Sequence, residues 1–277
     1  MRLRNVRKSG NVIDRRGRGG GRVALGGIGG VGLIAVVLIG LFFGIDLTPL
    51  LTGGSSSAPT QTSAPRDLTQ AEEEAGDFVA RVLATTEDVW GEVFPAQLDA
   101  QYQPPQLVLF SGMVNSGCGG ASAATGPFYC PSDETAYLDT DFFATLQQEL
   151  GAGGDFAAAY VIAHEVGHHL ENELGILRQV QGRAGADGTQ VRIELMADCF
   201  AGIWGQGVED LLEPGDVEEA INAAQRIGDD YLQRRAGQAV NPDGFTHGTS
   251  EQRARWFMRG YESGDVQQCD TFATDDL

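Results

Sequence analysis

Three of the four histidines in this 277-residue chain lie within residues 164–169, which read His-Glu-Val-Gly-His-His. On a helix, residues i and i+4 share one face, so His164 and His168 can direct their rings at one metal ion. Glu165 can then reach a water molecule beside that ion. Two imidazoles and an open coordination position suit zinc. His169 points about 100° away from His168, so we do not count it as a ligand.

The surrounding residues predict a buried helix. Asp155 can begin the helix, an apolar run follows, and Leu174 and Gly175 are typical of a helix end. Buried imidazoles need polar partners, which a metal supplies. The alternative is a polar helix face with incidental histidines, and the apolar surroundings favour the metal site.

A second amphipathic segment offers a third ligand. Glu194 and Asp198 are four residues apart, among apolar neighbours, so both carboxylates share one face. We expect Glu194 to bind the metal and Asp198 to accept the outward N–H of a metal-bound histidine. An ordinary solvated pair of carboxylates is the alternative, which the apolar neighbours disfavour.

Three separated motifs, in this order, resemble those of the neutral zinc metallopeptidases, a family of membrane-anchored bacterial proteins. The motifs are residues 164–169, residues 194–199 (Glu-Leu-Met-Ala-Asp-Cys) and residues 245–253 (Phe-Thr-His-Gly-Thr-Ser-Glu-Gln-Arg), and the resemblance covers roughly residues 66–277. It departs at Glu171 and Met196, where the family pattern has glutamine. The wider similarity is to gluzincin peptidases, which implies one Zn²⁺ ion held by two histidines and one glutamate, and a peptide or protein substrate.

The expected fold class is α+β, a helix-rich zincin-like metallopeptidase domain with a small sheet. The pattern predicts helices over residues 68–90 and 216–234, a last helix capped by Thr249 and Gln252 and reaching residue 261, and strands over 107–110 and 135–138. The resemblance implies that a strand near 135–138 forms the sheet edge against which an extended substrate lies.

The expected reaction is zinc-dependent peptide hydrolysis with Glu165 as the general base. His247 is the one histidine outside the metal helix. It is a candidate donor to the tetrahedral oxyanion, and a structural role is equally open. The alternative function is a catalytically silent, zinc-stabilised binding module of the cell envelope. The glutamate between the two histidines favours the peptidase, because a binding module needs no general base.

Residues 23–43 form an apolar run without a charge, about the length that one helix needs to cross a bilayer. Seven arginines and Lys8 precede the run, so residues 1–22 are predicted to be a cytoplasmic basic tail. Residues 44–66 are predicted to be a flexible linker and residues 67–277 an ectodomain outside the cytoplasm. A cleaved signal peptide is the alternative, which the prolines after Ala58 and Ala64 disfavour.

The net charge limits which partners the protein can bind, and the cysteine content indicates the redox compartment in which it folds. Residues 1–22 carry 8 of the 19 basic and 1 of the 38 acidic residues, so the remainder has 11 basic against 37 acidic residues, a net charge of −26. Such a surface repels nucleic acid, which is not an expected partner. Four cysteines beyond the apolar run fit two disulfides in an oxidising compartment. Of three possible pairings we favour Cys118 with Cys130 and Cys199 with Cys269.

Overall fold

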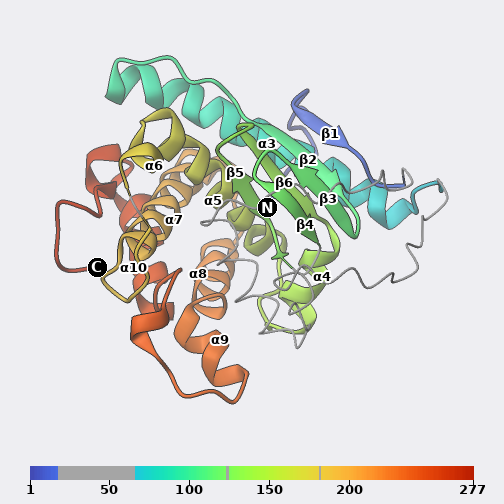
Figure 1. Ribbon diagram of the computed structural model, residues 1–277. Helices are drawn as coiled ribbons and strands as arrows, with labels where there is room; N and C mark the ends of the chain where they lie inside the picture. The colour runs from blue at the N-terminus through green and yellow to red at the C-terminus, as the bar shows by residue number, and fades with distance from the viewer. Residues whose placement is uncertain (18–65, 123–124, 181) are drawn as a thin grey trace.

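One small sheet lies beside a group of long helices in the computed structural model, which describes residues 1–17, 66–122, 125–180 and 182–277 (Figure 1). The sheet has four strands in the order β1-β2-β6-β5, and β1, β2 and β6 run parallel while β5 is antiparallel to β6. Their bounds are Val12–Asp14 (β1), Gln106–Phe110 (β2), Phe128–Cys130 (β5) and Thr135–Asp139 (β6). A separate hairpin joins β3 (Met113–Ser116) to β4 (Gly119–Ser122).

Both expected strands are present as β2 and β6, and both are buried along most of their length. The expectation that the strand near residues 135–138 forms a sheet edge is wrong, because β6 lies between β2 and β5. The outer strand on this side of the sheet is β5, which contacts the helix that carries the histidines.

The helices follow the hydrophobic pattern, with two differences in extent. The bounds are Gln70–Leu98 (α3), Asp141–Gln148 (α4), Asp155–Glu173 (α5), Ile176–Gln179 (α6), Thr189–Gly207 (α7), Asp216–Arg226 (α8), Asp229–Arg235 (α9) and Ser250–Ser263 (α10), with 3-10 turns at Glu209–Leu211 (η2), Pro242–Gly244 (η3) and Val266–Cys269 (η4). The first long helix extends beyond the predicted residue 90. The predicted helix 216–234 is interrupted at Gly228, where a Cβ atom would overlap the backbone of Ser250.

The histidine-bearing helix α5 occupies the centre of the domain. It lies between the sheet and α7 (Figure 1) and also contacts α3 and α8. Nearly every residue from Phe156 to Asn172 is buried, which explains the unbroken apolar run from Phe156 to Ala163. The predicted capping box of the last helix is confirmed: Thr249 and Gln252 cap α10 reciprocally.

Residues 1–17, here called the N-terminal strap, pack against the domain formed by residues 66–277. Strand β1 extends the sheet by pairing with β2, and the amino nitrogen of Met1 lies 2.7 Å from Asp155 at the start of α5. Arg7 forms ion pairs with Glu87 and Asp88 of α3. The sequence had predicted this segment to be part of a cytoplasmic basic tail, and it did not predict these contacts.

The predicted transmembrane run, residues 23–43, lies outside the described residues, as does nearly all of the predicted linker. Within the described part of the chain, no helix combines the length and apolar character that a membrane crossing requires.

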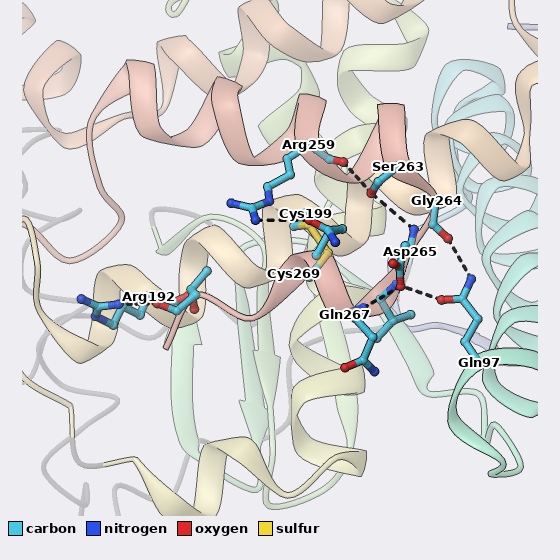
Figure 2. Close-up of a disulfide and its surroundings, with 12 residues drawn as sticks. Gln97, Arg192, Cys199, Arg259, Ser263, Gly264, Asp265, Gln267 and Cys269 are labelled. Atoms are coloured by element: carbon cyan, nitrogen blue, oxygen red, sulfur yellow. Dashed lines mark hydrogen bonds between the residues drawn. A yellow bond between two sulfur atoms is a disulfide. The ribbon is translucent and has the colours of Figure 1, made fainter. Parts of the chain in front are cut away.

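Two disulfides join Cys118 to Cys130 and Cys199 to Cys269, the pairing that the sequence favoured. The second bond fastens the C-terminal turn η4 to α7 (Figure 2). The side chain of Gln97 on α3 holds the same turn, because its amide donates to the carbonyl of Gly264 and accepts from the N–H of Val266. The C-terminal segment is therefore fixed to two helices of the core.

Candidate metal centre

Helices α5 and α7 bring the three predicted metal ligands together. His164, His168 and Glu194 each offer a ligand atom, and these atoms all lie within 4.8 Å of one another. The Nε2 atom of His164 is 3.1 Å from Oε2 of Glu194, and the Nε2 atom of His168 is 3.7 Å from Oε1 of the same carboxylate. All three side chains are largely buried.

A carboxylate fixes the orientation of each of the two histidine rings. Nδ1 of His164 lies 2.8 Å from Oδ1 of Asp198, and Nδ1 of His168 lies 2.8 Å from Oε2 of Glu171. Each Nδ1–H donates to a buried carboxylate, so both Nε2 atoms are left to face Glu194. This is the tautomer that two metal-binding histidines require.

Asp198 is the centre of a buried polar network. Its Oδ1 accepts a hydrogen bond from the hydroxyl of Tyr160 at 2.5 Å, and Arg253 of α10 donates to both carboxylate oxygens, at 2.8 and 3.0 Å. Burial alone would raise the pKa of Asp198, but Arg253 and His164 outweigh it and hold this pKa below its usual value. Asp198 is therefore a charged acceptor for His164.

Glu165 lies beside the two histidines on the buried face of α5. Its Oε2 atom has no hydrogen-bond partner among the described residues, although it is shielded from solvent. Burial raises the pKa of Glu165 above its usual value, against the opposing effect of His168 and His164. An unpaired buried carboxylate is costly, and such residues concentrate at functional sites.

His247 lies in the loop between η3 and α10, near enough to Glu194 for the two side chains to shift each other's pKa. The carboxylate of Asp229 holds this loop by accepting the backbone N–H groups of Thr246, His247 and Gly248 at 2.7, 2.7 and 3.1 Å. Burial works to lower the pKa of His247, but Glu194 and Asp229 together raise it. The loop therefore brings the ring of His247 within electrostatic reach of the proposed ligand Glu194.

The donor set and the charge around it fit a divalent cation. Burial opposes ionisation of Glu194, yet His247 and His168 hold its pKa well below the usual range. Burial works to lower the pKa of His168, but the carboxylates of Glu194 and Glu171 raise it well above its usual value. A site that attracts protons this strongly onto imidazole nitrogens also attracts a metal ion that competes for them.

A close contact sets the spacing between the two ligand helices. Gly167 of α5 lies against Ala197 of α7, and a Cβ atom on Gly167 would be 2.9 Å from the Cα and from the carbonyl oxygen of Ala197. Along α5, Gly167 stands between His164 and His168. Along α7, Ala197 stands between Glu194 and Asp198. Only glycine permits this approach.

His169 lies away from the site, as the helical geometry predicted. Its Nδ1 atom lies 3.0 Å from the hydroxyl oxygen of Tyr129, and its Nε2 atom lies 2.6 Å from the carbonyl oxygen of Gln103, both within hydrogen-bond distance. The sequence did not identify Glu171, Tyr160 or Arg253 as members of the site. The spacing of Glu171 three residues after His168 is a signal that could have revealed it.

Comparison with known proteins gives a match over almost the whole chain. The family described as "Putative neutral zinc metallopeptidase" matches residues 1–272. The chain is 48% identical to "Uncharacterized protein YpfJ" of Escherichia coli strain K12, over 98% of this chain and 99% of that protein. It is 46% identical to "Uncharacterized protein Rv2575" of Mycobacterium tuberculosis, over 74% of each chain. No solved structure matches.

Proposed function

This chain belongs to the neutral zinc metallopeptidase family, and from that premise we propose that it hydrolyses peptide bonds, with one zinc ion held by His164, His168 and Glu194. The observation that carries the proposal is the orientation of the two histidines. Both Nε2 atoms face Glu194 because both Nδ1 atoms are occupied by carboxylates. This set supplies three protein ligands and leaves a position open for chemistry.

Glu165 is the proposed general base. Bound zinc supplies a Lewis acid that lowers the pKa of water and polarises the scissile carbonyl. The carboxylate of Glu165 takes a proton from the attacking water and passes it to the leaving amine. Its buried Oε2 has no partner among the described residues, and burial raises its pKa. Both properties suit a group that must accept and then release a proton near neutral pH.

His247 is the proposed donor to the oxyanion that forms at the substrate carbonyl. Asp229 fixes the loop beneath the ring through three backbone hydrogen bonds. The carboxylates of Glu194 and Asp229 favour a protonated ring, which can donate. A preorganised donor of this kind stabilises the transition state more than the ground state.

The proposed peptide-binding edge is β5. This strand is the outer strand on the side of the sheet opposite β1, and it contacts α5, the helix that carries Glu165. An extended peptide that pairs with β5 would be bound by its backbone, with little selection of side chains.

The alternative, a zinc-stabilised module that binds a partner without turnover, uses the same three ligands. It leaves Glu165 unexplained, because a binding module has no use for a buried carboxylate between two ligands whose Oε2 atom has no hydrogen-bond partner among the described residues. We therefore favour the peptidase.

The proposed place of action is the cell envelope. Two disulfides stabilise the domain, and such bonds persist in oxidising compartments. The apolar run of residues 23–43 would supply the contact with lipid.

A digestion of a diverse peptide library by the purified protein, with and without a chelator, tests the proposal. Glu165→Gln should retain stoichiometric zinc and lose at least about 10²-fold in cleavage rate, because the amide cannot accept the proton. Glu173→Gln is the matched control on the same helix, and it should cleave like the wild type. Equal rates for Glu165→Gln and wild type would contradict the mechanism. A zinc-loaded wild type that cleaves no peptide would favour the binding module.

A further inference from the structure

The two ends of the segment 18–65 meet at one point of the fold. The backbone N–H of Arg66 donates a hydrogen bond to the carbonyl oxygen of Gly17 at 2.9 Å. Gly17 has a φ of +67°, and a Cβ atom there would overlap the carbonyl oxygen of Arg66. The chain therefore leaves the described fold at residue 17 and rejoins it beside the same residue.

The N-terminal strap is built into the domain by a carboxylate of α3. Glu87, whose side chain is 9% exposed, accepts hydrogen bonds from the side chains of Arg7, Ser9 and Asn11. All three donors come from the strap. Without it, a largely buried carboxylate would lose the partners that compensate its desolvation.

The sequence of α3 also makes room for the strap. The guanidinium of Arg16 donates to Asp14 and to the carbonyl oxygen of Glu72, and its side chain is 1% exposed. It lies over Gly76 in the second turn of α3, where a Cβ atom would overlap Nη2 of Arg16. Glycine weakens the interior of a helix, so its presence at position 76 needs an explanation. The space that it leaves for the side chain of Arg16 supplies one.

We propose that the N-terminal strap and the domain of residues 66–277 lie on the same side of the membrane, in place of the expectation that a bilayer separates them. One crossing would put about 30 Å of hydrocarbon between the strap and every partner described above. The basic residues of the strap then have another explanation than a cytoplasmic location: Arg7 and Lys8 neutralise acidic groups of α3. The inference holds whether or not the metal centre binds zinc.

Cross-linking and sidedness of labelling test the proposal in the full-length protein in cells. Lys8 and Asp77 form an ion pair and are each about half exposed, which suits a pair of cysteine substitutions. Lys8→Cys with Asp77→Cys should be joined by a short bismaleimide, and the joined peptides are identified by mass spectrometry. Lys8→Cys with Glu92→Cys is the control. Glu92 is also exposed on α3, but it is about 22 Å further along the helix, so no link should form.

The second measurement uses a membrane-impermeant maleimide on intact spheroplasts carrying either single cysteine. The proposal requires the two positions to behave alike, both labelled or both protected until the membrane is opened. Labelling of Asp77→Cys with protection of Lys8→Cys, or the reverse, would overturn it. Absence of the cross-link between positions 8 and 77 would overturn it as well, because exposed positions that form an ion pair are within reach of the reagent.

Discussion

Arg253 and Asp198 form a buried, two-point ion pair directly behind a proposed metal ligand. Nε of Arg253 lies 2.8 Å from one carboxylate oxygen of Asp198 and Nη2 lies 3.0 Å from the other. The side chain of Arg253 is 2% exposed and that of Asp198 is fully buried. Because Asp198 also accepts a hydrogen bond from Nδ1 of His164, α10 helps to determine how a residue of α5 faces the site.

Replacement of Arg253 by methionine should weaken zinc binding. Asp198 would lose its fixed position, and His164 would lose the acceptor that orients its ring. Loss of such an outer partner typically costs about 10–100-fold in metal affinity, and a buried carboxylate left without its cation destabilises the fold by about 3–5 kcal/mol. Competition with a chromophoric chelator measures the affinity. Arg255→Met is the control, because Arg255 is half exposed and lies 3.8 Å from an exposed Asp276; an equal loss in both variants would refute the positioning role.

Glu171 should support His168 through hydrogen bonding. Glu171→Gln retains an acceptor for Nδ1 of His168 and should bind zinc more tightly than Glu171→Leu, which removes that acceptor. We expect a loss of about 10–100-fold for the leucine variant and a smaller loss for the glutamine variant. The same chelator competition ranks the two. Identical affinities would show that the hydrogen bond of 2.8 Å between these side chains does not tune the site.

Two glycines of α3 should respond in opposite directions to alanine. Gly76→Ala would displace Arg16 from its place over the helix and should destabilise the protein by about 1–3 kcal/mol. Gly91 has open space around its Cβ position, so Gly91→Ala should stabilise by about 0.5–1 kcal/mol through helix propensity. Urea unfolding followed by circular dichroism compares them. Stabilisation by both substitutions would mean that Arg16 does not occupy this position in solution.

Glu173 should make the protein less stable as the pH rises. Burial raises the pKa of Glu173 from its ordinary value of 4.5 to about 7, although the N–H of Gln103 donates to its carboxylate. The folded state thus binds a proton more tightly than the unfolded state, and stability falls between pH 4.5 and 7 and levels off above. Glu173→Gln should gain about 1–2 kcal/mol over wild type at pH 8 and nothing at pH 4. Urea unfolding at both pH values is the measurement. The exposed Glu149→Gln should show no such trend, and a constant difference for Glu173→Gln would exclude this cause.

Local patterns predicted the parts of the fold whose physics is local. The run from Asp155 to Leu174 and the pair of Thr249 and Gln252 each contain their own helix signals, and both appear in the structure as expected. The pairing of His164 with His168 could be predicted for the same reason, because the i, i+4 spacing of two histidines is a property of one helix.

The remaining features depend on segments far apart in the chain. The contacts of the strap were not predicted, because the charge of Arg7 is visible in the sequence whereas its partner Glu87 is not. Gly228 ends α8 because the start of α10 approaches it closely, and no local pattern reports that approach. The ion pair of Arg253 with Asp198 was not predicted, since the crossing of α10 over α7 cannot be deduced from either helix alone.

The contact between Gly167 and Ala197 acts as a fixed spacer for the site. It prevents α5 and α7 from moving closer and, with both helices buried, the surrounding core prevents them from separating. The contact therefore sets how far His164 and His168 on α5 lie from Glu194 on α7, whose ligand atoms all fall within 4.8 Å of one another. In this protein, the geometry of the proposed metal centre would follow from the absence of one methyl group, at a position that offers no ligand atom.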